Sequence, residues 1–171
     1  SLLAHSDVMR QRCEALQKQL RSWRAQRQPL AYGTSKYDVI ASTGALWVCL
    51  CLDDHRLGPM STYVLSLVPD LFEAFQLRDN EELSETAHDV LVQVASHPFS
   101  VAQVPVLLEA LLDILRRSES WHSRLDALPL LQIVYFQNLY LLSHDMKRCI
   151  LDVLCSLLHD PHVEVRDMAA T

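Results

Sequence analysis

Two arginines, Arg124 and Arg166, are 42 positions apart and share the same local setting. One lies in the segment 120–125 and the other in 160–166, each a few residues after a polar break that precedes a helical pattern. A period of roughly 40–47 residues is typical of proteins built from repeated pairs of helices. The spacing therefore predicts helical hairpins stacked in a row, and such a scaffold favours a binding surface over a catalytic centre.

The composition agrees with a helical chain. Half of the residues are apolar, only three are glycine, and leucine is plentiful while β-branched runs are scarce. We expect an all-α fold, a HEAT-like α-solenoid segment of roughly eight helices. Residues 1–171 are predicted to form a single such segment. The clearest repeats are 120–158 and 160–171, the second of them truncated.

Charge is distributed unevenly along the chain. The net charge is −6, so the chain as a whole lacks the basic footprint of a nucleic-acid-binding protein. Residues 1–28 nevertheless carry a local charge of +4. One interpretation is an anion-binding surface formed by Arg10, Arg21 and Arg24. The alternative is the solvated face of a surface helix.

The cysteines and the hydropathy pattern indicate a cellular compartment. The five cysteines form no recognisable disulfide framework: Cys13, Cys49, Cys51, Cys149 and Cys155. We found neither a signal peptide nor an apolar run long enough to span a membrane. We therefore expect a soluble intracellular protein, with no membrane partner and no direct nucleic-acid partner. The start without methionine and the end within a helical pattern suggest a segment of a longer protein.

Capping residues and periodicity predict the individual helices. Asn80 and Ser120 are expected to cap helices, Pro69 to begin one, and Pro129 to kink one. The predicted ranges are 6–26 with Ser6 as its cap, 35–52, 60–78 divided at Pro69, one after Asn80, one from Pro105, one from Trp121, 145–158 and one after Pro161. A turn is predicted at 53–59.

The repeated arginines have a structural explanation. A guanidinium early in a hairpin can bond carbonyl groups or an aspartate of the adjacent turn, while its stem covers apolar surface. Asp160-Pro161 would form a tight corner between units, because proline cannot continue the preceding helix. These features predict a structural repeat signature: Trp121, Arg124, Asp160, Pro161, Val165 and Arg166.

The last third of the chain resembles a known family. The segments that carry the resemblance are 120–124, 128–132, 135–140 and 163–171, and the closing one, Val163-Glu164-Val165-Arg166-Asp167-Met168-Ala169-Ala170-Thr171, is the most specific. They resemble the C-terminal HEAT region of the proteasome activator complex subunit 4 family, the large ATP-independent proteasome activators. That family usually has glutamate at the position of Asp167.

The resemblance implies a function for the whole family protein. It implies a long solenoid that caps the core proteasome in the nucleus and cytoplasm and promotes degradation without ubiquitin or ATP. Acetylated histones are implied partners, with links to histone degradation and DNA repair. Inositol phosphate is an implied ligand of the parent protein. For this segment itself we expect no cofactor, no catalytic residue and no metal site.

Asn138 lies between Tyr135 and Tyr140, which makes these three residues the candidate acetyl-lysine site. An amide can donate to the acetyl carbonyl, and aromatic rings can surround its methyl group. The alternative is a buried asparagine in mid-helix that bonds a neighbouring carbonyl, with both tyrosines in the core. His159 and His162 are too few for zinc and lie on a turn. Neither a catalytic triad spacing nor a glycine-rich phosphate loop is found.

Two other functions remain alternatives to the proteasome activator. One is a HEAT-type adaptor of another system, such as a transport receptor or a phosphatase scaffold. The other is a stand-alone acetyl-lysine-binding module.

Overall fold

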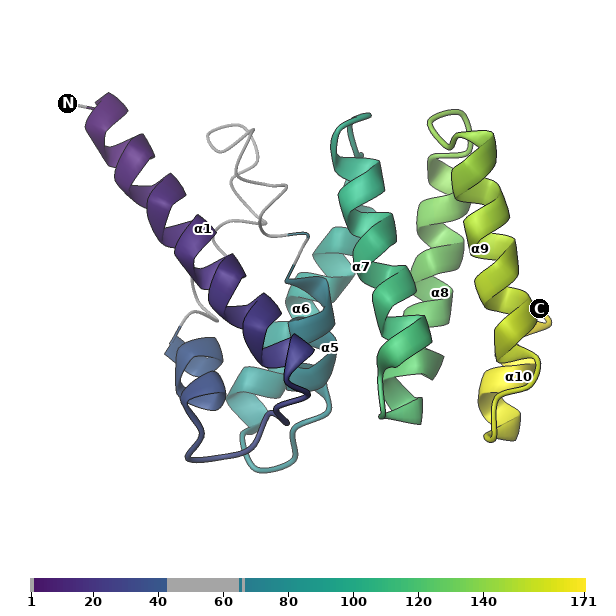
Figure 1. The fold of residues 1–171 in the computed structure, drawn as a ribbon, viewed down its shortest axis with the longest axis horizontal. Helices are drawn as coiled ribbons and strands as arrows, with labels where there is room; N and C mark the ends of the chain where they lie inside the picture. The colour runs from purple at the N-terminus through teal and green to yellow at the C-terminus, as the bar shows by residue number, and fades with distance from the viewer. Residues whose placement is uncertain (1, 43–64, 66) are drawn as a thin grey trace. The chain divides into compact units, whose positions relative to one another are not determined.

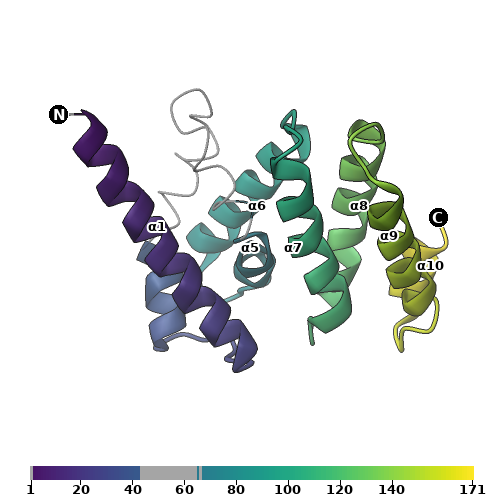
Figure 2. The same ribbon diagram turned by 45° about the horizontal axis from the view of Figure 1, so that its top comes forward.

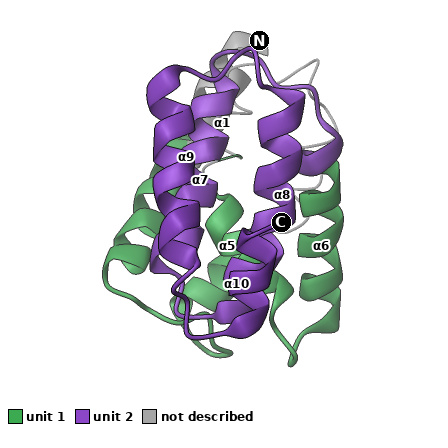
Figure 3. Ribbon diagram, turned by 90° about the vertical axis from the view of Figure 1, so that its right-hand side faces the viewer, with its two compact units in different colours: residues 1–93 green, residues 94–171 purple. Residues whose placement is uncertain are grey.

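The computed structural model describes residues 2–42, 65 and 67–171 (Figures 1 and 2). Every regular element in this part of the chain is a helix, which confirms the all-α prediction. The chain divides into two compact units, residues 1–93 and 94–171, which are described separately below (Figure 3). Within the described ranges, no helix combines the length and the apolar character needed to cross a lipid bilayer.

Unit 1 begins with a long helix. Its elements are α1 (Leu2–Ala25), a helix over residues 35–42, α5 (Val68–Phe75) and α6 (Glu81–Ser96), whose last residues belong to unit 2. The prediction that Ser6 caps the first helix is wrong, because α1 already begins at Leu2. Leucine and alanine favour helix, so nothing before Ser6 interrupts the helical backbone. The chain turns after α1 at Arg27 and Gly33, which both have positive φ.

A proline and an asparagine mark two helix starts in unit 1, as predicted. Pro69 lies in the first turn of α5, where its missing N–H costs no helical hydrogen bond. Asn80 caps α6, because its Oδ1 accepts a hydrogen bond of 3.0 Å from the backbone N–H of Leu83. The apolar stripe of α6 is buried: Leu83, Ala87, Val90, Leu91 and Val94.

The predicted helix over 35–52 is described only in part. Residues 35–42 are helical, and Tyr37 and Ile40 are buried. The rest of that prediction lies outside the described residues, together with Cys49, Cys51 and the turn predicted at 53–59.

Unit 2 consists of two helical hairpins. The first pairs α7 (Gln103–Arg117) with α8 (Trp121–Gln137), and the second pairs α9 (His144–Leu157) with α10 (Val163–Ala169). α7 packs against α9 and α8 packs against α10, so the hairpins lie layer on layer (Figures 1 and 2). A shift of 42 residues places α7 on α9 to within two residues at either end. The period seen in the sequence is therefore a period of the structure.

Two helices of unit 2, α8 and α9, begin after serine caps. The side chain of Ser120 accepts a hydrogen bond from the backbone N–H of Ser123, and that of Ser143 accepts one from Met146. Four leucines of α7 are buried: Leu108, Leu111, Leu112 and Leu115. α8 continues through Pro129 without interruption, and Pro129 is exposed.

Candidate functional site

The corner that joins α9 to α10 contains a buried acidic residue. Asp160 follows the end of α9, and its side chain is only 5% exposed. Its Oδ1 accepts a hydrogen bond of 2.9 Å from the backbone N–H of His162, the residue that precedes α10. Pro161 comes between them, and proline fixes its own φ close to the value that a tight turn requires. The corner therefore holds the Asp160 carboxylate in one orientation.

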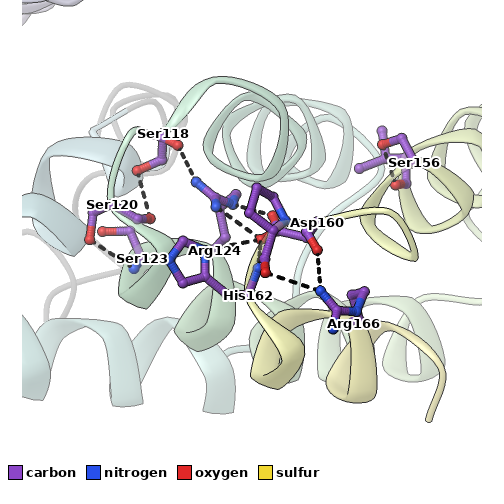
Figure 4. A network of polar contacts seen from close by, with 10 residues as sticks. Ser118, Ser120, Ser123, Arg124, Ser156, Asp160, His162 and Arg166 are labelled. Atoms are coloured by element: carbon purple, nitrogen blue, oxygen red, sulfur yellow. Dashed lines mark hydrogen bonds and ion pairs between the residues drawn. The ribbon is translucent and has the colours of Figure 1, made fainter.

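Arg124 of α8 reaches this carboxylate from the preceding hairpin. Its Nε donates to Asp160 Oδ2 at 2.8 Å and its Nη2 donates to Oδ1 at 3.2 Å, while Nη1 donates to the carbonyl of Ser118 at 2.6 Å (Figure 4). The planar guanidinium thus binds one carboxylate in a bidentate manner and one carbonyl of its own hairpin. The side chain of Arg124 therefore links the first hairpin of unit 2 to the second.

Arg166 repeats half of this arrangement. Its Nη1 donates to the carbonyl of Asp160 at 2.6 Å, and Asp160 precedes Arg166 by the same six positions that separate Ser118 from Arg124. Nη1 also lies 3.1 Å from the carbonyl oxygen of Pro161. Val165 beside it is fully buried. The repeat pattern predicts bonds from such an arginine to carbonyl groups or to an aspartate, and Arg124 forms both kinds.

Two effects compete at Asp160. Burial favours the neutral acid, but the hydrogen bonds from Arg124 and from the backbone N–H of His162 outweigh it and hold the pKa of Asp160 below its ordinary value. Asp160 is therefore a carboxylate at neutral pH and forms an ion pair with Arg124.

Three aromatic rings lie beside the corner. The ring of His162 stacks on Trp121 with centroids 5.0 Å apart and an interplanar angle of 10°, and His122 stacks on the same indole at 3.8 Å. Trp121 belongs to α8, whereas His162 precedes α10, so the stack crosses from one hairpin to the other. Trp121 is one of the predicted repeat residues, but its stacking partner was not predicted, because stacking depends on the distance between the two hairpins.

The two histidines considered for zinc have other contacts. Nδ1 of His162 lies 3.3 Å from Asp160 Oδ1, and Nδ1 of His159 lies 3.3 Å from the carbonyl of Cys155. In the part of the chain that the structure describes, no three His, Cys, Asp or Glu side chains are grouped as a metal site.

The three acetyl-lysine candidates are in different environments. Asn138 is buried, and its Nδ2 donates to the carbonyl of Val134 at 2.9 Å, as the structural alternative supposed. Its mid-helix position was a wrong prediction, because α8 ends at Gln137 and Asn138 is the residue that closes it. An asparagine side chain can bond its own helix end, which favours this position. Tyr135 is half-buried, and Tyr140 is almost fully exposed, not a core residue.

The three anion-binding candidates are not equivalent either. Only the backbone of Arg10 is described, and Arg21 is exposed. Arg24 lies largely within unit 1, where its Nε is 3.5 Å from Oδ2 of Asp70. Part of the positive charge of Arg24 is therefore compensated by the Asp70 carboxyl group within the same unit.

Asp70 belongs to a buried charged cluster that the sequence analysis missed. Its residues come from three helices: Arg24 of α1, Lys36 of the 35–42 helix, and Asp70 and Glu73 of α5. Lys36 is buried, pairs with the carboxylate of Glu73 and donates to the carbonyl of Gln28 at 3.1 Å. Asp70 is fully buried, yet neither of its oxygens accepts a hydrogen bond from a described residue. Burial, partly offset by the charge of Arg24, raises the pKa of Asp70 to about 7.

Comparison with known proteins gives a consistent family. The chain is 36% identical over 113 residues to proteasome activator complex subunit 4A of Danio rerio. It is 31% identical to subunit 4 of Xenopus laevis and 33% identical to that of Homo sapiens, each over 118 residues. The similarity covers 63–64% of this chain, well beyond the last third that carried the resemblance in the sequence.

These relatives are much longer proteins. The matched part corresponds to 6% of the length of each. No protein-family model and no solved structure matches the chain. All five relatives are named as subunit 4, 4A or 4B of the proteasome activator complex, and the chain belongs to the proteasome activator complex subunit 4 family.

Proposed function

We propose that the chain is a scaffold and recognition segment of a proteasome activator. The observation that carries this proposal is the agreement among the relatives, which are all named as subunit 4 of the proteasome activator complex. The packing of unit 2 is suited to a scaffold, because layered hairpins transmit position along a series of contacts between neighbours.

In the proposed activity, the full-length protein caps the core proteasome and promotes degradation without ubiquitin or ATP. This segment contributes shape and stiffness and takes no part in bond cleavage. The Arg124–Asp160 pair supports such a role, since it fixes one hairpin against the next with a bidentate ion pair. The core proteasome is the proposed partner, in the nucleus and the cytoplasm.

Acetylated histones are a second candidate partner. The observation in favour is the position of Asn138, which ends α8 two residues before the exposed ring of Tyr140. For an acetyl-lysine to bind there, the Asn138 amide would have to use its second N–H or release the carbonyl of Val134.

The decisive experiment uses the full-length protein that carries this segment. It is mixed with purified core proteasome, binding is followed by co-sedimentation, and hydrolysis of a fluorogenic peptide is measured without nucleotide. We expect co-sedimentation and faster hydrolysis. An Arg124→Met variant should reduce both, whereas Arg148→Met, an exposed residue on α9, should reduce neither.

The outcomes separate the alternatives. Failure of the folded full-length protein to bind the core proteasome would contradict the proposal and favour an adaptor of another system. Acetylated and unmodified histone-tail peptides test the second candidate by calorimetry. Equal binding of the two peptides, or binding that survives Asn138→Ala, would exclude the acetyl-lysine site.

A further inference from the structure

The second half of α8 carries an apolar stripe on its solvent-facing side. Its members are Pro129, Ile133, Phe136 and Tyr140, which we call the α8 stripe, and all four are exposed. Phe136 is 66% exposed, and Tyr140, in the turn that follows α8, is 98% exposed. Aromatic side chains of this kind contribute much of the buried area when an interface forms. The buried residues of the same stretch lie on the other side of the helix: Ala127, Leu130, Leu131 and Val134.

The spacing of the α8 stripe is that of a helix-pairing seam. Its members are separated by 4, 3 and 4 positions. Residues three and four positions apart share one face of a helix, and this alternation is the one through which two helices pack side by side in a coiled coil. Tyr140 continues the spacing beyond Gln137, the last residue of α8. The stripe therefore has a period that a second helix of the same spacing can match.

The α8 stripe is free of charge. No aspartate, glutamate, lysine or arginine occurs between Asp126 and Asp145. Gln132 and Gln137 flank the stripe as exposed amides, which can both donate and accept hydrogen bonds. A charged side chain placed against the stripe would be buried without a counter-charge. The surface is thus complementary to an uncharged apolar helix face, and α8 itself has such a face.

Antiparallel pairing of two copies of α8 also matches the side chains by size. With a twofold axis between Ile133 and Phe136, Ile133 of one copy faces the partner's Phe136, and Pro129 faces the partner's Tyr140. Each aromatic ring then meets a smaller side chain, which is the alternation of large and small residues that fills a helix interface without voids. A parallel pair would instead place Phe136 against the partner's Phe136.

We propose that the α8 stripe is the contact surface between two copies of this chain, which pair through α8 in antiparallel orientation. The two aromatic rings of each copy bury roughly 300 Å² in such a pair. Counted over both copies, and with the smaller side chains included, this area is near the lower limit for specific association. The result is a weak, reversible dimer. The inference rests on this surface and not on the proposed function, and its test involves no proteasome.

The test is sedimentation equilibrium of the 171-residue chain over about a hundredfold range of concentration, up to the high micromolar range. We expect the average mass to rise from that of a monomer toward that of a dimer. Phe136→Glu should weaken the association by roughly a hundredfold or more, because each copy would bury a carboxylate against Ile133. Tyr140→Ser should weaken it by roughly tenfold. The control is Val101→Glu, which changes a valine that is 69% exposed and lies outside the stripe.

A mixture of two variants tests the antiparallel orientation. Ile133→Lys and Phe136→Glu should each be monomeric alone, because both contacts of every pair would place a charge against an apolar side chain. In an equal mixture, the introduced lysine of one variant meets the introduced glutamate of the other, while the remaining Ile133 and Phe136 still face each other. The mixture should therefore dimerise, although neither variant does so by itself.

The opposite results overturn the proposal. A chain that stays monomeric over the whole concentration range has no such interface. A dimer that a folded Phe136→Glu variant leaves intact is formed by another surface. A mixture of two folded variants that stays monomeric excludes the antiparallel orientation. Circular dichroism establishes that each variant is folded, and Tyr140→Ser decides the matter if a charged variant is not, because the replaced ring is almost fully exposed.

Discussion

Among the described residues, unit 1 and unit 2 each contain a buried aspartate near an arginine, and the two carboxyl groups behave in opposite ways. In unit 1, Asp70 is fully buried, and Nε of Arg24 lies 3.5 Å from its Oδ2. In unit 2, Asp160 receives two hydrogen bonds from Arg124 and one from a backbone N–H. The pKa of Asp70 is raised to about 7, whereas that of Asp160 is lowered.

The comparison shows that proximity of an opposite charge does not decide the ionisation of a buried acid. Hydrogen bonds to the charged form must replace those lost from water, and only Asp160 has them. Asp160 therefore links the hairpins at neutral pH. Asp70 is held in an environment that favours its neutral form.

The largest expected effect is the pH dependence of unit 1. Unfolded Asp70 loses its proton near pH 3.8, but folded Asp70 keeps it until about pH 7. Stability is thus greatest below the unfolded pKa and falls as the pH rises between these values, by on the order of 4 kcal/mol. The slope of stability against pH is measured by urea unfolding at several pH values between 4.5 and 7.5. Residue-resolved hydrogen exchange of the α5 amides, corrected for the intrinsic rate at each pH, is the readout. Asp70→Asn should flatten the slope, and an unchanged slope would break the comparison.

Loss of the bidentate pair should be the next largest effect. Arg124→Met leaves Asp160 buried with its charge uncompensated, and we expect unit 2 to lose about 3 kcal/mol at pH 7. Arg24→Met should cost unit 1 clearly less, because Asp70 can remain protonated. Arg148→Met is the control for removing an exposed arginine. Equal losses for Arg124→Met and Arg24→Met in urea unfolding would refute the distinction drawn here.

Acid should act on unit 2 with the opposite sign. Because the folded pKa of Asp160 is depressed, its contribution is complete above the unfolded value and disappears as the pH falls through the folded pKa. The effect is smaller than that of Arg124→Met, since a protonated Asp160 can still accept hydrogen bonds. The protection factors of the α10 amides, which are exchange rates corrected for the intrinsic rate at each pH, should fall from pH 5 to 3 in the native chain. Asp160→Asn should remove this acid-dependent part, and its persistence would contradict the assignment.

A helix cap should give the smallest effect. Ser120→Ala removes the acceptor for the backbone N–H of Ser123 and should cost unit 2 about 1 kcal/mol, measured by thermal unfolding. Ser156→Ala is a suitable control, because that hydroxyl only bonds back to the carbonyl of Val153 within α9. If both variants destabilise unit 2 to the same extent, the cap of α8 has no special role.

Local signals predicted much of the fold. Asn80, Ser120 and Pro69 mark helix starts because capping depends on residues within one turn. The 42-residue period predicted that Arg124 would meet polar groups of an adjacent turn, and the match of α7 to α9 extends this period to the whole hairpin.

Long-range contacts were beyond the sequence. Lys36 and Glu73 are 37 positions apart, and no local pattern pairs them. The stack of His162 on Trp121 likewise requires two hairpins at a fixed distance. The error at Asn138 has a different origin: the apolar run continues past Gln137, so hydrophobicity alone did not reveal where α8 ends.

The Asp160 corner gives unit 2 a polarity. In the contact between the two hairpins of unit 2, the earlier hairpin supplies the cation, Arg124, and the later hairpin supplies the anion, Asp160. Such a connection is head-to-tail and cannot be satisfied by two identical faces related by a twofold axis, where Arg166 would oppose Arg166. A contact of this kind therefore has a direction along the chain, because its arginine comes from the earlier hairpin and its carboxylate from the later one.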